Sequence, residues 1–345
     1  MSHFTQPTVE QDPVMRVLNP WQHHFPLVPE PYAELAQALD EPVPKVLALL
    51  AQAQRTGALS RIGGVFAPEA GGAALLAAMR VPPHRLEAVA AQVSSHPGVN
   101  HNYEREGDYN LWFVMTARCR DSLEQALQWV ERHTGLSVMR LRMLKSYRID
   151  LGFDMTRSLV LRSARAAKAA AAPVAQADQP LAALLEEGLP LIDRPYLAWA
   201  EKLGRSETAV LDTLSLWLAQ GTLRRFGMVV RHHEMGFDAN AMTVFDVPDD
   251  AIDACGDRLA RHPGVTLAYR RERAASWPFN LYCMVHGRER DDVQRLIDEL
   301  TQTCGLSDMP RQILFSRRRF KQIGARRFRP LTTAFQAHDD GISVQ

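Results

Sequence analysis

The sequence of 345 residues has few cysteines, almost no net charge and no long apolar run. Its four cysteines are far apart and form no Cys-x-x-Cys pair, which suits a reducing compartment and argues against a zinc or iron–sulfur site. No apolar run approaches the length that spans a membrane, and the N-terminus lacks the basic-then-apolar form of a signal peptide. These absences predict a cytoplasmic protein.

The charges are balanced, with 40 basic and 39 acidic residues, so the chain as a whole does not generate the positive field of a typical nucleic-acid-binding protein. An apolar fraction of 46% and a charged fraction of 23% are ordinary for a globular protein. The length allows two or more domains with cores of their own.

One stretch stands out because it combines a turn, an alternating segment and an apolar run. The turn is His96-Pro97-Gly98-Val99, and the apolar run covers residues 111–117. The pattern predicts a β-hairpin whose first strand carries His101, Tyr103 and Arg105 on one face, because side chains in a strand repeat every two residues. An imidazole, a phenol and a guanidinium on one face are an unusual choice for packing alone. The alternative is a solvated face with Tyr103 half-buried.

The same stretch occurs a second time, beginning at His262-Pro263-Gly264-Val265. Tyr269 and Arg271 match Tyr103 and Arg105, but Leu267 stands where the first copy has His101. Other motifs repeat in the same order, which indicates a tandem duplication. Only the first copy keeps the imidazole in its hairpin.

Each half begins with two helical patterns followed by a short strand. In the first half the second helical pattern ends at Gly57, and the strand lies within residues 58–66. Helix, turn, helix and wing predict a winged helix-turn-helix. The periodicities that follow predict the order β-α-β-β-α-β of a ferredoxin-like unit.

The predicted fold class is therefore α+β, a tandem pair of winged helix-turn-helix plus ferredoxin-like (βαββαβ) units. We expect the two sheets to pack together, so that the chain is an internal pseudo-dimer; whether two chains also form a homodimer stays open. The predicted parts are an N-terminal arm (1–20), winged helix 1 (21–66), ferredoxin-like domain 1 (67–154), a linker (155–182), winged helix 2 (183–230), ferredoxin-like domain 2 (231–330) and a tail (331–345).

This domain order resembles the Lrp/AsnC family of transcription regulators, which implies DNA binding. A recognition helix must present basic or polar side chains to phosphates and base edges. The first candidate helix, residues 42–55, offers only Lys45 and Arg55, and the second, residues 206–220, has two acidic residues and no basic one. We therefore expect no DNA partner.

Several motifs in a fixed order resemble the siroheme decarboxylases, in the form that fuses the NirD and NirL types of d1-haem biosynthesis. The motifs are Phe25-Pro26-Leu27 with Pro31-Tyr32, Arg61-Ile62-Gly63 and Arg225-Phe226-Gly227, the two His-Pro-Gly-Val hairpins, Asn110-Leu111-Trp112-Phe113, and Arg231-His232-His233 with Asn240. The resemblance covers about residues 21–330. The two halves differ in one motif: the first half has Phe66-Ala67-Pro68 where the second has Arg231-His232. The number of working sites, one or two, therefore stays open.

The resemblance implies that two acetate groups of siroheme lose their carboxyl groups, which gives 12,18-didecarboxysiroheme. It implies no cofactor and no metal of the protein's own, because the iron enters with the substrate. The implied partners are siroheme, its decarboxylated product and other proteins of d1-haem biosynthesis, with no membrane. The competing interpretation is a tetrapyrrole-responsive binding protein or regulator without catalysis.

Decarboxylation leaves electron density on a methylene carbon, to which a proton must be delivered. Histidine is well suited to that task near neutral pH. His101 is the candidate acid, with Tyr103 as its helper. His232 either plays the corresponding role for the second half or ligates the iron of siroheme, and His101 is the other candidate for that ligand.

A macrocycle edged with carboxylates requires several cations and an apolar or aromatic wall. Trp112 and Tyr282 either flank the ring or are core aromatics. Arg317 to Lys321 either extend the cationic rim or are solvated, whereas Arg327 and His286 are expected at the surface. The candidate substrate-binding residues are Arg61, Arg105, Asn110, Trp112, Lys145, Arg225, Arg231, Tyr269, Arg270 and Arg271.

Overall fold

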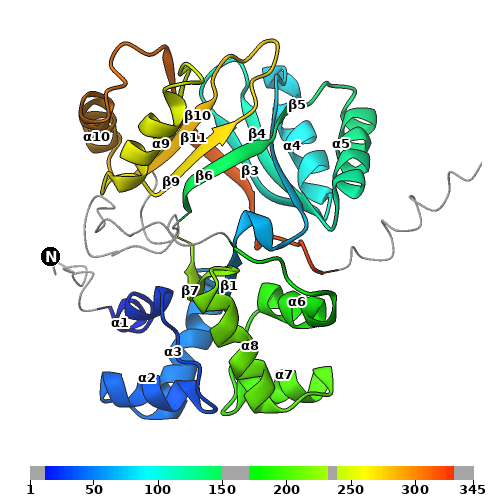
Figure 1. Ribbon diagram of the computed structural model, residues 1–345, viewed down its shortest axis with the longest axis vertical. Helices are drawn as coiled ribbons and strands as arrows, with labels where there is room; N and C mark the ends of the chain where they lie inside the picture. The colour runs from blue at the N-terminus through cyan, green and yellow to red at the C-terminus, as the bar shows by residue number, and fades with distance from the viewer. Residues whose placement is uncertain (1–11, 150–170, 232–238, 330–345) are drawn as a thin grey trace, which may run out of the picture.

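The computed structural model describes residues 12–149, 171–231 and 239–329, and it has two lobes (Figure 1). One lobe holds the helix-turn-helix elements of both halves, and the other is built on one large β-sheet with helices outside it. The helices of the first lobe are α1 (Pro13–Leu18), α2 (Pro31–Leu39), α3 (Val43–Arg55), α6 (Gln179–Glu187), α7 (Pro195–Leu203) and α8 (Glu207–Ala219).

The two helix-turn-helix units contact each other by reciprocal bonds. The Tyr32 hydroxyl donates to the Pro190 carbonyl (2.8 Å), and the Tyr196 hydroxyl donates to the Pro26 carbonyl (2.7 Å). Both tyrosine side chains are fully buried. In a two-fold dimer interface, each contact occurs twice, once from either side, between equivalent residues. The first lobe is therefore an internal dimer within one chain.

Between the lobes lie β1 (Leu59–Phe66) and β7 (Leu223–Val230), which pair antiparallel with Gly63 opposite Gly227. The short strand expected as the wing is thus present in each half, and each strand pairs with the strand of the other half. A Cβ on Gly227 would lie 2.4 Å from the Gln22 carbonyl oxygen, so only glycine permits this close backbone approach.

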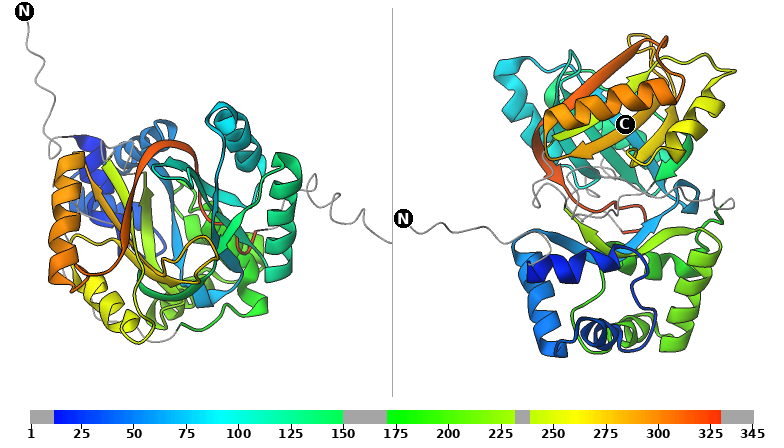
Figure 2. Two further views of the ribbon diagram at one scale, coloured as in Figure 1. Left: turned by 90° about the horizontal axis from the view of Figure 1, so that it is seen from above. Right: turned by 90° about the vertical axis from the view of Figure 1, so that its left-hand side faces the viewer.

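The second lobe has a nine-stranded sheet in the order β5-β2-β4-β3-β11-β8-β10-β9-β6. Four helices cover its outer faces, α4 and α5 from the first half and α9 and α10 from the second, on opposite sides of the lobe (Figure 2). The helices are α4 (Leu86–Ser95), α5 (Arg120–Thr134), α9 (Ile252–Arg261) and α10 (Arg290–Thr303); the strands are β2 (Ala73–Met79), β3 (Val99–Arg105), β4 (Leu111–Ala117), β5 (Met139–Leu141), β6 (Met143–Ile149), β8 (Ala239–Phe245), β9 (Leu267–Arg271), β10 (Leu281–Gly287) and β11 (Arg311–Gln322).

The two ferredoxin-like units share strands. The first part of β11 pairs with β8 of its own half, and from Ser316 onward it pairs with β3 of the other half. In the first half, the last strand of the expected βαββαβ unit is divided at Arg142, with β5 paired to β2 and β6 paired to β9. Each half therefore completes the sheet of the other.

Alternation along the strands separates two kinds of core. Residues such as Phe113 and Phe245 face the outer helices, whereas Trp112, Tyr282 and Met242 belong to a cluster on the inner face, where the sheets of the two halves meet. The inner face is where the hairpin motifs of both halves converge.

Two predicted boundaries are corrected. Helix α1 lies inside the segment expected to be a loose arm, and Met15, Val17 and Leu18 are buried in the core of the first lobe. Helix α6 starts at Gln179, inside the expected linker, and buries Leu181 and Leu185. Both helices are short, so their apolar spacing gives little signal until the core that they cover is known. Among the described residues no helix is long and apolar enough to cross a membrane.

Candidate active site

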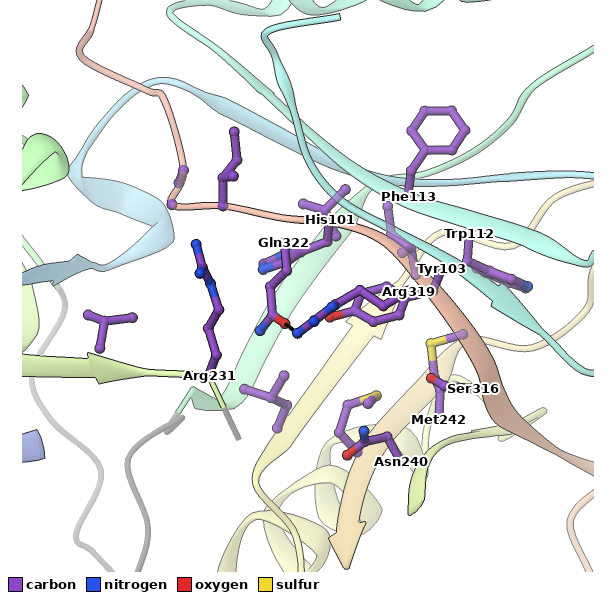
Figure 3. Close-up of a pocket in the computed structure, with 18 of the residues that line it drawn as sticks. His101, Tyr103, Trp112, Phe113, Arg231, Asn240, Met242, Ser316, Arg319 and Gln322 are labelled. Carbon is purple, nitrogen blue, oxygen red and sulfur yellow. Dashed lines mark hydrogen bonds between the residues drawn. The ribbon is translucent and has the colours of Figure 1, made fainter. Parts of the chain in front are cut away.

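A cavity of about 390 Å³ lies between the β1–β7 pair and the inner face of the large sheet (Figure 3). Both halves contribute to its wall. Among the described residues, the charged side chains that line it are nine arginines and one carboxylate: Arg61, Arg105, Arg225, Arg231, Arg271, Arg317, Arg318, Arg319, Arg327 and Glu186.

The hairpin strands form two facing walls. His101, Tyr103 and Arg105 of β3 all line the cavity, in agreement with the alternation read from the sequence. Strand β9 contributes Tyr269 and Arg271, with Leu267 at the position equivalent to His101. Figure 3 shows His101 and Tyr103 on the cavity side of β3, where Gln322 and Arg319 of β11 pair with them.

The guanidinium groups are held by backbone carbonyls. Arg105, only 7% exposed, donates from Nη1 to the Leu314 carbonyl (3.0 Å), and Arg225, 6% exposed, donates from Nη1 to the Gln22 carbonyl (2.6 Å). Burial lowers the pKa of Arg105 to about 10; for Arg225, burial and the nearby charge of Arg61 lower the pKa to about 9. Both side chains stay cationic at neutral pH.

Several of these cations have unmet hydrogen-bonding capacity. Within the described ranges, the buried Nε atoms of four cavity arginines have no hydrogen-bond partner: Arg61, Arg225, Arg271 and Arg327. A buried donor without an acceptor costs free energy, and more so when it is charged. The cavity is therefore built for a ligand that brings several anionic oxygens.

The imidazole of His101 and the phenols of Tyr103 and Tyr269 are kept neutral. Burial lowers the pKa of His101 to about 4, and the charges of Arg61 and Arg105 lower it further in the same direction. Burial also raises the pKa of Tyr103, and that of Tyr269 to about 12. At neutral pH these three groups, one imidazole and two phenols, are thus uncharged.

Trp112 and Tyr282 are core aromatics that also line the cavity. Each is 1% exposed and belongs to the inner core. The Trp112 Nε1 donates to the Tyr109 carbonyl (2.6 Å), and the Tyr282 hydroxyl accepts a bond from Trp277 Nε1 (2.7 Å). With Met242 and Met284 they form an apolar wall suited to a planar ring.

Three predicted binding residues lie away from the cavity. Asn110 bonds both the N–H and the C=O of Val81 (2.9 and 2.8 Å), which fixes the hairpin loop to the end of β2. Lys145 pairs with Asp253 of α9 (3.1 Å) on the outer face. Arg270 pairs with Asp249 (3.3 Å), because it alternates with the inward-facing Tyr269 and Arg271. His232 lies outside the described residues.

Other cavity residues were missed. His286 was expected at the surface but lies in the cavity wall. Alternation along β10 could have predicted this, because His286 is on the same face of the strand as Tyr282. Arg327 was expected to be solvated and instead donates to the Ala67 carbonyl (2.8 Å). Glu186 of α6 accepts three backbone N–H bonds from residues 327–329. No local pattern predicts that contact, since the partners are far apart in sequence.

No group of three or more His, Cys, Asp or Glu side chains in the described part of the chain is arranged to hold a metal ion.

Comparisons with known proteins define the class first. An AsnC-like ligand-binding domain matches residues 70–149 and 234–321, and a siroheme decarboxylase NirDL-like helix-turn-helix domain matches residues 15–59 and 178–224. The chain is thus a duplicated protein of the AsnC-like class with two helix-turn-helix domains.

Full-length relatives give the family. A siroheme decarboxylase NirDL subunit of Paracoccus pantotrophus is 39% identical over 90% of this chain and 96% of that protein. A siroheme decarboxylase of Hydrogenobacter thermophilus is 30% identical over 92% of this chain and 95% of that protein. A crystal structure of the siroheme decarboxylase NirDL in co-complex with an iron-uroporphyrin III analogue has a TM-score of 0.62 at 28% identity and covers 93% of this chain and 95% of that one. The chain belongs to the siroheme decarboxylase family, whose members are carboxy-lyases.

The buried neutral histidines predict how stability depends on pH. His101, His96 and His286 each have a pKa lowered to about 4 chiefly by burial, whereas unfolded histidine titrates near 6.5. As pH falls below 6.5 the unfolded chain binds protons that the folded chain does not. The free energy of unfolding should therefore fall, by up to about 1.4 kcal/mol per pH unit for each histidine.

Urea unfolding at pH 7.0 and 5.5, with wild type and His101→Asn compared, isolates one of these groups. The variant should lose less stability than wild type over this interval. Equal losses in the two proteins would contradict a neutral His101 in the cavity wall.

Proposed function

We propose that this chain removes two acetate carboxyl groups from siroheme and produces 12,18-didecarboxysiroheme. The observation that carries the proposal is the cavity, which is lined among the described residues by nine guanidinium groups and one carboxylate, with imidazoles and phenols on the same walls. The relatives named as siroheme decarboxylases support the same substrate.

Binding uses charge at the rim of the macrocycle and apolar contact on its faces. The arginines of β1, β7 and the hairpins pair with the carboxylates of siroheme, and each such charge-assisted bond contributes roughly 1.5–3 kcal/mol. Trp112, Met242 and Met284 contact the ring. The bound carboxylates also supply acceptors for the buried Nε atoms that lack a partner.

The chemical step breaks the bond between the methylene carbon and the carboxylate carbon. Carbon dioxide leaves, and the electron pair stays on the methylene carbon, where a proton from His101 completes a methyl group. His101 is neutral in the empty cavity because of burial and of Arg61 and Arg105. When substrate carboxylates neutralise these arginines, the imidazolium becomes more favourable, and the proton is available only with substrate in place. Tyr103, which stays protonated, orients the reacting group.

The regulator interpretation is not favoured by the helices that would read DNA. Helix α8 carries no Lys or Arg, and its Glu207 pairs with Arg194. In α3, Lys45 pairs with Glu41 at 2.8 Å. Arg55, in the last turn of α3, is the remaining basic residue of these two helices, so they contribute little to the phosphate contacts that dominate DNA affinity.

Anaerobic incubation with siroheme followed by mass spectrometry tests the activity. Wild type should release two molecules of carbon dioxide per siroheme. His101→Ala should release none and still bind the ring, because its substitution removes the proton donor and leaves the arginines in place. Unchanged siroheme with the wild-type protein, combined with tight binding to operator DNA, would support the regulator instead; full activity of the variant would refute the role of His101.

Neighbouring arginines on β9 provide a matched pair for binding. Arg271 faces the cavity and Arg270 pairs with Asp249 outside it. Arg271→Met should weaken the binding of iron uroporphyrin, measured by absorbance titration, by about 10-fold or more because one charge-assisted bond is lost. Arg270→Met should leave the dissociation constant unchanged. Equal effects of the two substitutions would argue against carboxylate recognition in the cavity.

A further inference from the structure

One wall of the cavity is formed by a chain segment that belongs to no sheet. Strand β11 ends at Gln322, and residues 323–329, which we call the strap, continue from it in an irregular conformation. Four strap residues line the cavity: Ile323, Gly324, Ala325 and Arg327. Other walls are formed by β3, β9 and β10, each of which pairs with a strand on both of its sides. Displacing the strap breaks no such ladder, so it is the part of the wall that moves at the lowest cost.

The strap connects the two lobes. Near its start, the Ile323 N–H donates to the Asn100 carbonyl (2.8 Å) and the Arg326 N–H donates to the Thr116 hydroxyl (3.0 Å), both in the second lobe. Near its end, the Phe328 ring packs on Phe66 in the core of the first lobe, with the ring centroids 4.8 Å apart. The strap therefore crosses from one lobe to the other beside the cavity (Figure 1).

One carboxylate fastens the strap to the first lobe. Glu186 of α6, only 3% exposed, accepts bonds from the backbone N–H groups of Arg327 (2.8 Å), Phe328 (3.2 Å) and Arg329 (3.2 Å). The Nε atom of Arg329 lies 3.8 Å from the same carboxylate. Hydrogen bonds to an ionised acceptor are stronger than those between neutral groups. Three consecutive amides thus depend on one side chain and are released together when it lets go.

The strap covers groups that a bound tetrapyrrole needs. A Cβ on Gly324 would lie 2.5 Å from Nη1 of Arg61, so the strap backbone lies directly against this guanidinium. Arg105 and Arg225 are no more than 7% exposed. A rigid macrocycle carries its carboxylates around its whole rim, so it requires a wide opening to bring them to these arginines. A wall that moves aside provides that opening.

We propose that the strap is the gate of the cavity and that Glu186 is its latch. This inference rests on the proposed function for the class of ligand, a tetrapyrrole with several carboxylates. The bonds to Glu186 break, the strap moves aside, the macrocycle enters, and the bonds form again with the strap closed beside the ring. Arg61 and Arg327 lie close enough to Glu186 for its charge to act on them. Substrate carboxylates therefore compete with the latch for the same cations, which favours opening when substrate arrives.

Stopped-flow absorbance with iron uroporphyrin tests the gate without any turnover. In the wild type the observed binding rate should reach a plateau as the ligand concentration rises, because opening of the strap limits entry. Glu186→Gln keeps the size of the side chain and removes its charge and one acceptor oxygen. The plateau should rise by about 10-fold or more, because charge-assisted bonds are lost. Dissociation should accelerate by a similar factor, which leaves the dissociation constant within about threefold of wild type.

Glu187→Gln is the matched control. Glu187 is the next residue of α6 and is exposed. Its substitution changes the net charge equally, and with it the long-range attraction of an anionic ligand, but keeps the latch. Its rates should stay within about twofold of wild type. Phe328→Ala, which removes the packing on Phe66 and keeps Glu186, should also raise the plateau and serves if Glu186→Gln fails to fold.

Three results would overturn the inference. The first is a plateau that neither Glu186→Gln nor Phe328→Ala raises, and the second is an equal rise with Glu187→Gln. The third is weaker equilibrium binding by Glu186→Gln with an unchanged association rate, which would make Glu186 a binding group and not a latch. Failure of the wild type to bind iron uroporphyrin at all would instead refute the tetrapyrrole site of the proposed function.

Discussion

The rest of the structure depends on the burial of guanidinium groups that have carbonyl partners but few carboxylate partners. Removing such a cation from water costs several kcal/mol, and carbonyl hydrogen bonds return only part of it. Arg105 and Arg225 are held in this way, and in the described part of the chain Glu186 is the one acid in the cavity wall. A polyanionic ligand supplies the missing acceptors and should therefore stabilise the folded chain in proportion to its affinity.

Duplication explains how one chain builds such a cavity on an internal axis. The axis passes between Gly63 and Gly227, so every residue near it has a counterpart from the other half. Tyr269 and Arg271 are the counterparts of Tyr103 and Arg105, whereas the counterpart of His101 is Leu267. Under the proposed function, the halves share the residues assigned to carboxylate binding and differ at the residue assigned to proton transfer, as expected for a macrocycle that is itself asymmetric.

Much of this organisation is predictable from the sequence, for stated physical reasons. Repeated motifs predict the tandem fold, and alternation in residues 99–105 predicts the face that carries His101. By the same alternation, Arg270 points away from the cavity if Arg271 points into it. His286 points into the cavity if Tyr282 does, because the two lie an even number of residues apart on β10. Two features could not be predicted in this way. Strand β11 pairs with strands of both halves, and Glu186 contacts residues 327–329; in each case the partners are far apart in sequence, so no local pattern indicates the contact.

The most direct test of the central claim is the position of the iron in crystals of this chain grown with siroheme, located by anomalous scattering. The account predicts one iron site inside the cavity between β3 and β9, with carboxylates of the macrocycle paired to Arg61, Arg105 and Arg271. An iron site on the outer surface of α3 or α8, with the cavity unoccupied, would contradict it.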